Sequence, residues 1–289
     1  MRLLAAGSIA LDTLEGPFGT VTGELGGSAL YFALSASLIR PVEIVAPVGN
    51  DAETAVRAVL AGRPVDVSRV SLVDLPTYRW SALQQAGTNL DRGSVDGIYD
   101  RWRPDVPAGY DGWAFVGSMR PDRQLQAAEA LRGTARLLAA DSMRSYLTSH
   151  RERAEEVVKA SHWFFANREE LAALGGDPAD PDRFRTRWDL AGLVVKAGEQ
   201  GCSIWTEAES TSLPALTTRS VVDVTGAGAA LAGGMLAAWL ESGGEPAGLR
   251  AALAHGIACA SLAISAVGLR GLAEANRADL AERVAEVLG

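Results

Sequence analysis

The chain has 289 residues, 48% of them hydrophobic, enough for one large α/β domain or two of ordinary size. Its formal net charge of −8 argues against general binding to nucleic acids or to anionic membranes. The N-terminus is apolar only briefly, which does not predict a signal peptide, and no apolar stretch is long enough to span a membrane. We therefore expect a cytoplasmic protein.

The predicted elements alternate between strands and helices along the chain. A strand is expected at residues 3–8, a helix at 27–39, a strand at 43–48 and a helix at 52–60. Strands follow at residues 113–117 and 135–141 on either side of a helix at 123–131, and again at 163–166 and 193–196. Three helices, at residues 227–240, 248–266 and 272–288, end the pattern. This alternation is typical of a mostly parallel sheet covered by helices on both faces.

The most informative stretch is Asp223-Val224-Thr225-Gly226-Ala227-Gly228-Ala229. A β-branched run leads into it and an Ala/Leu/Met-rich helical pattern follows, which predicts a strand, a glycine turn and a helix N-terminus. Such a turn directs several backbone N–H groups at one point, where the helix dipole adds partial positive charge. It can hold a phosphate or a transient oxyanion.

This stretch resembles the anion-hole signature Asp-Thr-x-Gly-Ala-Gly-Asp of the ribokinase-like (PfkB-type) carbohydrate and nucleoside kinases. The resemblance implies that Gly226, Ala227 and Gly228 hold the transferring phosphoryl group. It also implies that oxygens of Asp223 and Thr225 help to bind a monovalent cation such as K⁺. Val224 departs from the usual Thr of the signature.

Ala229 stands where the family carries its catalytic base, the last Asp of the signature. An alanine cannot take a proton, and losing a general base usually costs about 10² to 10⁴ in rate. Because the other motifs are present, we interpret the chain as a kinase whose base has been replaced, an Asp→Ala knockout at 229 that is inactive or severely impaired. The alternative is a natural pseudokinase that binds a nucleotide or sugar without turnover.

A dehydrogenase that uses Gly226, Ala227 and Gly228 to bind a dinucleotide is a third interpretation. It is disfavoured because Leu231 occupies the position where that fingerprint requires a third glycine or an alanine.

The resemblance extends to residues expected to bind the acceptor substrate. Asp12 ends a stretch similar to the family's first strand, and its carboxylate could accept two charge-assisted hydrogen bonds from sugar hydroxyls. Gly26, Gly27 and Ser28 follow, and glycines let the backbone approach a polyol closely. Asn50 lies in a segment similar to the family's Val-Gly-x-Asp. Without the resemblance, Asp12 and the glycines also fit ordinary turns.

Further residues are expected near ATP. Asn167 and Glu170 resemble the family's Asn-x-x-Glu, and at i and i+3 they share one helical face, where they could order water around Mg²⁺. The same pair also fits an ordinary helix start, with Asn167 as N-cap and Glu170 at N3. Lys196, Gly198 and Gly201 resemble the strand and Gly-x-x-Gly turn beside the ATP phosphates. Lys196 would offset phosphate charge or simply end a strand at the surface.

The resemblance implies an α/β fold, the ribokinase-like three-layer αβα sandwich with a mostly parallel central sheet and a small β-sheet lid. We expect a single domain over residues 1–289, with lid segments near 13–25 and 76–108. The implied reaction transfers the γ-phosphate of ATP, with Mg²⁺, to a hydroxymethyl group of a sugar or nucleoside. We expect no nucleic-acid or membrane partner, and a homodimer through the lid is one assembly that the family suggests. Tyr31 stands where adenosine kinases carry an Asn, which leaves the acceptor open.

Overall fold

The computed structural model describes residues 1–217 and 219–289. The main sheet consists, in chain order, of β1 (Leu3–Ala6), β4 (Val42–Gly49), β5 (Val65–Val73), β8 (Trp113–Val116), β9 (Leu137–Asp141), β10 (Trp163–Asn167), β11 (Gly192–Lys196), β12 (Cys202–Thr206) and β13 (Ser210–Leu213). Their order in the sheet is β13-β12-β11-β10-β9-β8-β1-β4-β5. The strands from β11 to β5 are parallel, while β12 and β13 are antiparallel. The predicted mostly parallel sheet is confirmed.

Both faces of the centre of this sheet are buried, which explains why inner strands such as β1 and β8 are continuously apolar. In β1, Leu3 and Ala5 pack into one core cluster and Leu4 and Ala6 into the other, and each is at most 2% exposed. Because successive side chains alternate between faces, a strand covered on both sides needs an apolar residue at every position.

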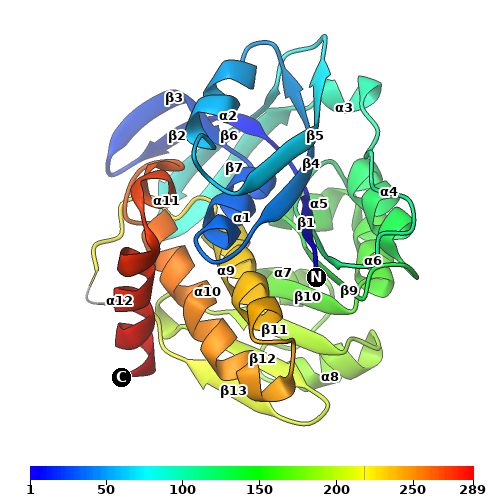
Figure 1. The fold of residues 1–289 in the computed structure, drawn as a ribbon, viewed down its shortest axis with the longest axis vertical. Coiled ribbons are helices and arrows are strands. Elements are labelled where there is room, and N and C mark those ends of the chain that lie inside the picture. The colour runs from blue at the N-terminus through cyan, green and yellow to red at the C-terminus, as the bar shows by residue number, and fades with distance from the viewer. Residues whose placement is uncertain (218) are drawn as a thin grey trace.

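Helices cover the two faces as separate layers (Figure 1). One layer contains α1 (Ser28–Ser37), α2 (Glu53–Val59), α9 (Ala227–Glu241), α10 (Leu249–Ala263), α11 (Arg270–Glu274) and α12 (Arg277–Leu288). The other contains α4 (Pro121–Leu131), α5 (Arg144–Ser149), α6 (Arg151–Ala160), α7 (Arg168–Ala173) and α8 (Pro181–Arg187). The result is the predicted three-layer αβα sandwich.

A second, smaller sheet lies beside the sandwich, at the upper left of Figure 1. It consists of β2 (Ala10–Gly16), β3 (Gly19–Gly26), β6 (Tyr78–Gln85) and β7 (Thr88–Val95), in the order β3-β2-β6-β7. Two antiparallel hairpins are joined through the parallel pair β2–β6. The small β-sheet expected from the sequence is therefore present. A short helix, α3 (Ile98–Arg101), follows β7 in a segment where no helix was predicted.

The C-terminal helix predicted at residues 272–288 is in fact two helices. The carbonyl groups at the end of α11 accept hydrogen bonds from the Arg63 guanidinium, which ends that helix. Asn276 then starts α12 in a capping box, because its side chain accepts from the Asp279 N–H while Asp279 accepts from the Asn276 N–H. The prediction followed the apolar period and missed this local cap.

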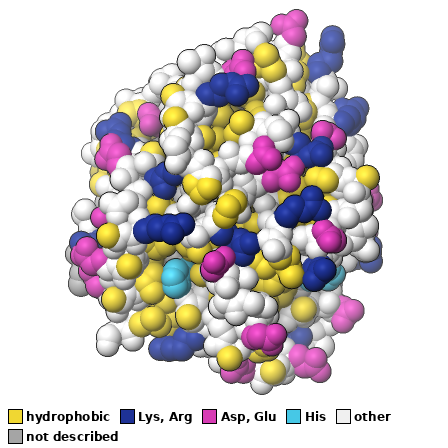
Figure 2. Space-filling view, in the orientation of Figure 1, with side chains coloured by type: hydrophobic (Ala, Val, Ile, Leu, Met, Phe, Trp, Pro, Cys, Tyr) yellow, Lys and Arg dark blue, Asp and Glu magenta, His cyan; other side chains and the backbone are white. Residues whose placement is uncertain are grey.

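Charged side chains of both signs are interspersed on the face shown in Figure 2. Some form exposed helical pairs, such as Arg57 with Glu53 and Arg151 with Glu155. Exposed pairs of this kind contribute about 0.3–0.5 kcal/mol each. Over residues 1–217 and 219–289, no helix combines the length and the apolar character that crossing a membrane requires.

Candidate active site

The predicted anion-hole turn forms the N-terminus of α9. Gly226 is the N-cap residue with φ of 75°, a left-handed conformation that favours glycine. A Cβ at this position would lie 2.3 Å from atoms of the Tyr31 ring, so a side chain has no room there. The first turn of α9 leaves backbone N–H groups without an intrahelical acceptor, and these can bind an anion.

The segment before the turn is not the strand that the sequence predicted. Residues 220–222 lie outside both sheets, and the Val222 N–H donates to the carbonyl of Ile264 at the end of α10. Val221 is 54% exposed, so the β-branched residues of this run do not mark a buried strand. The turn is therefore held by side chains and by α10 rather than by a sheet ladder.

Asp223 and Thr225 close this segment through hydrogen bonds. The buried Asp223 carboxylate accepts from the Thr225 N–H at 2.9 Å with one oxygen and from the Gly268 N–H at 3.0 Å with the other. The Thr225 hydroxyl accepts from the Asn89 amide at 2.9 Å. Each of these oxygens accepts one N–H, and cation binding by Asp223 and Thr225 stays a prediction.

Lys196 lies against the turn instead of at the surface. It ends β11, its side chain is 16% exposed, and its Nζ would be 2.9 Å from a Cβ at Gly228. Burial opposes its charge, but the carboxylates of Glu170 and Asp141 outweigh that effect and raise the pKa of the Lys196 ammonium. A protonated lysine therefore stands beside the N-terminus of α9, where it can offset phosphate charge.

Gly198 begins a 3₁₀ turn, η1 (Gly198–Gln200), shortly after β11, and Gly201 follows it. Both adopt positive φ, and a Cβ at Gly201 would lie 2.1 Å from the Leu213 carbonyl oxygen. The turn therefore requires glycine for backbone reasons, and it follows Lys196 at the carboxyl edge of the sheet.

Asn167 and Glu170 form a reciprocal capping box at the start of α7. The Asn167 side chain accepts from the Glu170 N–H at 2.8 Å, and the Glu170 carboxylate accepts from the Asn167 N–H at 2.7 Å. The same carboxylate lies 3.5 Å from the Lys196 Nζ. The helix-start role considered for this pair is present, and it also orients Glu170 toward the lysine.

Asp141 is a residue of this cluster to which the sequence analysis assigned no role. It ends β9, it is 5% exposed, and its Oδ1 has no hydrogen-bond partner among the described residues. Burial raises the pKa of the Asp141 carboxyl to about 7, with the nearby Lys196 acting in the opposite direction. The available signal was its position at a strand end, because ligands of parallel sheets bind along that edge.

We expect Asp141→Asn to stabilise the metal-free protein at pH 8 but hardly at pH 4. A folded pKa of about 7 lies above the unfolded value, so the folded state binds more protons between these values and loses stability as the pH rises through that window. Above it, the buried carboxylate costs about 2–4 kcal/mol, which the amide avoids. Urea unfolding of both proteins at the two pH values measures this, and an equal difference at both would contradict it.

Asp12 lies on β2 beside two aromatic side chains. It is 3% exposed, and its Oδ2 would be 2.3 Å from a Cβ at Gly26 on the neighbouring strand β3, so only glycine fits there. Burial raises the pKa of the Asp12 carboxyl well above its usual range, and the nearby Asp223 carboxylate adds to this. Asp12 Oδ1, Tyr31 Oη and Trp80 Nε1 are buried without partners elsewhere in the described part of the chain. Trp80 stands directly opposite Asp12 on β6.

Gly27 and Ser28 lie at the start of α1 and contact the residues that follow β1. The Ser28 hydroxyl donates to the Ser118 carbonyl at 2.9 Å, and the Ser28 N–H donates to the Ser8 hydroxyl at 3.0 Å. Gly27 has φ of 99°, and a Cβ there would lie 2.4 Å from the Ser8 carbonyl oxygen. These residues shape the wall next to Asp12 through the backbone.

The Asn50 side chain is exposed, and its contact with the acceptor stays a prediction. Its neighbour Asp51 is engaged instead, accepting from Thr77 at 2.6 Å and pairing with Arg79 at 2.7 Å. Since Arg79 belongs to β6, Asp51 anchors the start of that strand.

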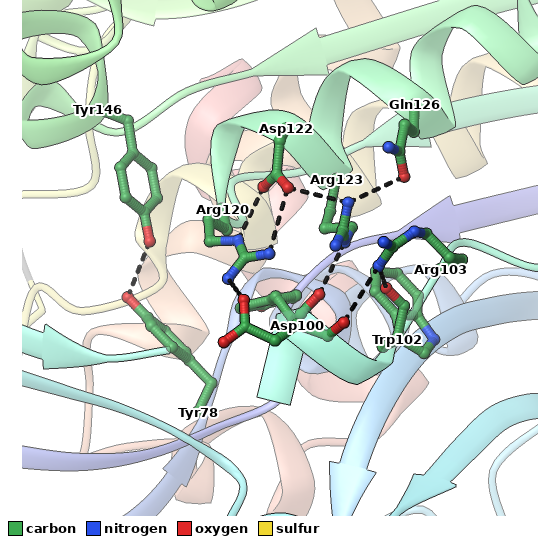
Figure 3. A network of polar contacts seen from close by, with 10 residues as sticks. Tyr78, Asp100, Trp102, Arg103, Arg120, Asp122, Arg123, Gln126 and Tyr146 are labelled. Carbon is green, nitrogen blue, oxygen red and sulfur yellow. Dashed lines mark hydrogen bonds and ion pairs between the residues drawn. The ribbon is translucent and has the colours of Figure 1, made fainter. Parts of the chain in front are cut away.

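The polar contacts in Figure 3 lie where β6 begins at Tyr78 and where the chain passes from β7 into α3. Arg120 donates to Asp122 at 2.8 Å and to Asp100 of α3 at 2.7 Å. The hydroxyl groups of Tyr78 and Tyr146 lie 3.4 Å apart. Arg120 is therefore held by carboxylates next to the segment that follows the β6–β7 hairpin.

A parallel αβα sandwich, a small sheet carrying a buried carboxylate and an anion-binding turn at the start of α9 define a ribokinase-like kinase fold. Residues 112–276 match the family model described as pfkB family carbohydrate kinase. The chain belongs to this family.

Similar proteins include nucleoside kinases as well as a fructokinase and a ribokinase. The chain is 27% identical to a cytidine kinase from Thermococcus kodakarensis over 257 residues, which covers 85% of this chain and 90% of the relative. The crystal structure of the Methanocaldococcus jannaschii nucleoside kinase superposes with a TM-score of 0.79 at 19% identity, covering 99% of both chains. The aminoimidazole riboside kinase from Salmonella enterica, solved with aminoimidazole riboside and an ATP analogue, superposes with a TM-score of 0.78 at 20% identity, covering 98% of this chain and all of the other.

Proposed function

We propose that this protein binds ATP with Mg²⁺ and that its site is built to transfer the γ-phosphate to a hydroxymethyl group of a nucleoside. The observation that carries the proposal is the Lys196 ammonium beside Gly228 at the N-terminus of α9. The cytidine kinase to which the chain is similar favours a nucleoside over a free sugar. Trp80, which is half-buried and stands opposite Asp12, provides aromatic surface that suits a nucleobase or sugar face.

In this proposal, different residues bind the acceptor, the transferring phosphoryl group and Mg²⁺. Asp12 accepts hydrogen bonds from acceptor hydroxyls, and the first turn of α9 with Lys196 holds the transferring phosphoryl group. The unpartnered Asp141 oxygen and the Glu170 carboxylate, both close to Lys196, fit Mg²⁺, which prefers oxygen ligands and retains water. Bound Mg²⁺ would neutralise charge on the phosphates. Asn167, Gly198 and Gly201 shape the nucleotide side of the site.

Position 229 limits the reaction. Ala229 is the third residue of α9 and is 6% exposed, and it offers no group to take the proton of the acceptor hydroxyl. We interpret the chain as a base knockout that binds both substrates and turns over slowly or not at all. The second candidate is a natural pseudokinase, for which the same alanine is the supporting observation.

We treat residues 1–289 as one catalytic unit whose small sheet covers the acceptor. Leu90 and Val95 of β7 are 41% and 64% exposed, which supports a homodimer formed through this sheet. Sedimentation of the Val95→Lys variant against the unmodified protein tests that assembly.

Calorimetry with MgATP, MgADP and NAD tests the proposed function. We expect both adenine nucleotides with Mg²⁺ to bind, and Lys196→Ala to weaken them by about 10-fold or more, since a charge-assisted contact is lost. Lys159→Ala serves as the matched control, because that lysine is exposed on α6 and pairs with Glu156. Binding of NAD without binding of ATP would refute the kinase assignment.

A further inference from the structure

The hairpin formed by β6 and β7 makes direct hydrogen bonds to the segment before the anion-hole turn. Gln84 at the end of β6 accepts from the Val224 N–H at 2.9 Å and donates to the Val222 carbonyl at 3.2 Å. Its side-chain amide thus pairs with the backbone as a neighbouring strand would. Asn89 at the start of β7 donates to the Thr225 hydroxyl at 2.9 Å.

This segment depends on such partners because no sheet holds it. Residues 220–222 are outside both sheets, and the Asp223 carboxylate closes back onto Thr225 and across to Gly268. Without Gln84, the Val224 N–H and the Val222 carbonyl would lose the partners that they have in the structure. Gly226, the N-cap residue of α9, follows only two residues after Val224, so the hydrogen bonds of Gln84 fix the backbone directly before the N–H groups that begin α9.

The same strand connects this contact to the acceptor carboxylate. β6 pairs with β2 in register from Ala10 opposite Tyr78 to Glu15 opposite Leu83, and Asp12 stands opposite Trp80. Residues 80 and 84 are an even number of positions apart and therefore share one face of the sheet. A displacement of β6 at Trp80 is consequently transmitted along a paired strand to Gln84.

We propose that Gln84 and Asn89 are positioning residues for phosphoryl transfer, which hold residues 222–225 so that the N–H groups of α9 face the phosphate, and which link this turn to the acceptor wall through β6. The inference rests on the proposed function. Asn89 bonds to Thr225, and Gln84 bonds to the backbone on either side of Asp223, so the small sheet takes part in ordering the turn.

Gln84→Ala and Gln85→Ala form a matched pair for the test. Gln85 is the next residue on β6, and its exposed side chain makes no hydrogen bond to the described residues. In Gln84→Ala, amide hydrogen exchange of residues 222–225 should quicken by about 10-fold, and MgADP should bind about 5- to 10-fold more weakly by calorimetry, the usual effect of losing such hydrogen bonds. Gln85→Ala should leave both quantities within about twofold of the unmodified protein.

Gln84→Glu provides the conservative rescue. Its carboxylate can still accept from the Val224 N–H but cannot donate to the Val222 carbonyl, so exchange protection and MgADP affinity should be intermediate. If Gln84→Ala does not fold, as judged by thermal unfolding, Gln84→Glu and Asn89→Ala carry the same comparison.

The possible outcomes separate the positioning role of Gln84 from the proposed kinase function. Faster exchange with MgADP affinity unchanged in Gln84→Ala would overturn the positioning role, and unchanged exchange would overturn the contact itself. A lower unfolding midpoint alone, without a change in MgADP affinity, would likewise mean a merely structural role. If the unmodified protein binds neither MgATP nor MgADP, the proposed function fails, while the exchange measurement still reports on the contact.

Discussion

Replacing Ala229 by Asp is expected to raise phosphoryl transfer by about 10²-fold or more, the usual contribution of a general base. The residue lies in the first turn of α9, where the helix dipole favours an ionised carboxylate. The protonated Lys196 close to Gly228 adds to the same effect. The new carboxylate would be one residue beyond the glycines proposed to hold the phosphoryl group, so it would be placed to take the acceptor proton.

ADP release measures this change, with cytidine, aminoimidazole riboside, ribose and fructose as acceptors. Ala229→Asn is the control, because it has nearly the size of Asp but cannot act as a base, and it should remain as slow as the unmodified protein. A revertant that turns over at once supports the knockout interpretation. A revertant that stays silent on an acceptor shown separately to bind would contradict that interpretation and favour a pseudokinase.

Asp12→Asn is expected to weaken acceptor binding by about 10²-fold, because two charge-assisted hydrogen bonds from hydroxyl groups are each reduced. MgATP should bind as before, since the proposed phosphate site lies on β11 and α9. The same change should stabilise the free protein at pH 8. The folded pKa of Asp12 lies well above its unfolded value, so its ionisation costs stability as the pH rises beyond the unfolded value, and the amide removes that cost.

Calorimetry with MgATP and with the acceptor panel, together with urea unfolding at pH 8, tests both halves of this expectation. Glu15→Gln is the matched control, since Glu15 lies on the same strand but is exposed. Equal loss of nucleotide and acceptor would show that Asp12 supports the structure rather than the acceptor. Lower stability in Asp12→Asn would contradict the unpaired, buried state of its carboxylate.

Local features of this protein were predictable from the sequence, because they depend on residues close together in the chain. Apolar periodicity indicated the strands and helices of the sandwich, and the Gly226 turn before α9 follows from the need for glycine at positive φ. The capping box of Asn167 and Glu170 is also local, with partners three residues apart. Even the overlooked division between α11 and α12 had a local signal, the Asn276 and Asp279 cap.

Tertiary structure alone decided which of these features meet. Asn89 and Gln84 reach the anion-hole segment across 136 to 140 residues of chain, and no sequence pattern states that a lid hairpin ends there. The burial of Asp141 beside Lys196 depends on β9, β10 and β11 being neighbours, which is a matter of strand order. A periodic pattern reports which face of an element is apolar, but partners and burial follow only when the elements are packed together, and that packing also sets the charge of each buried group.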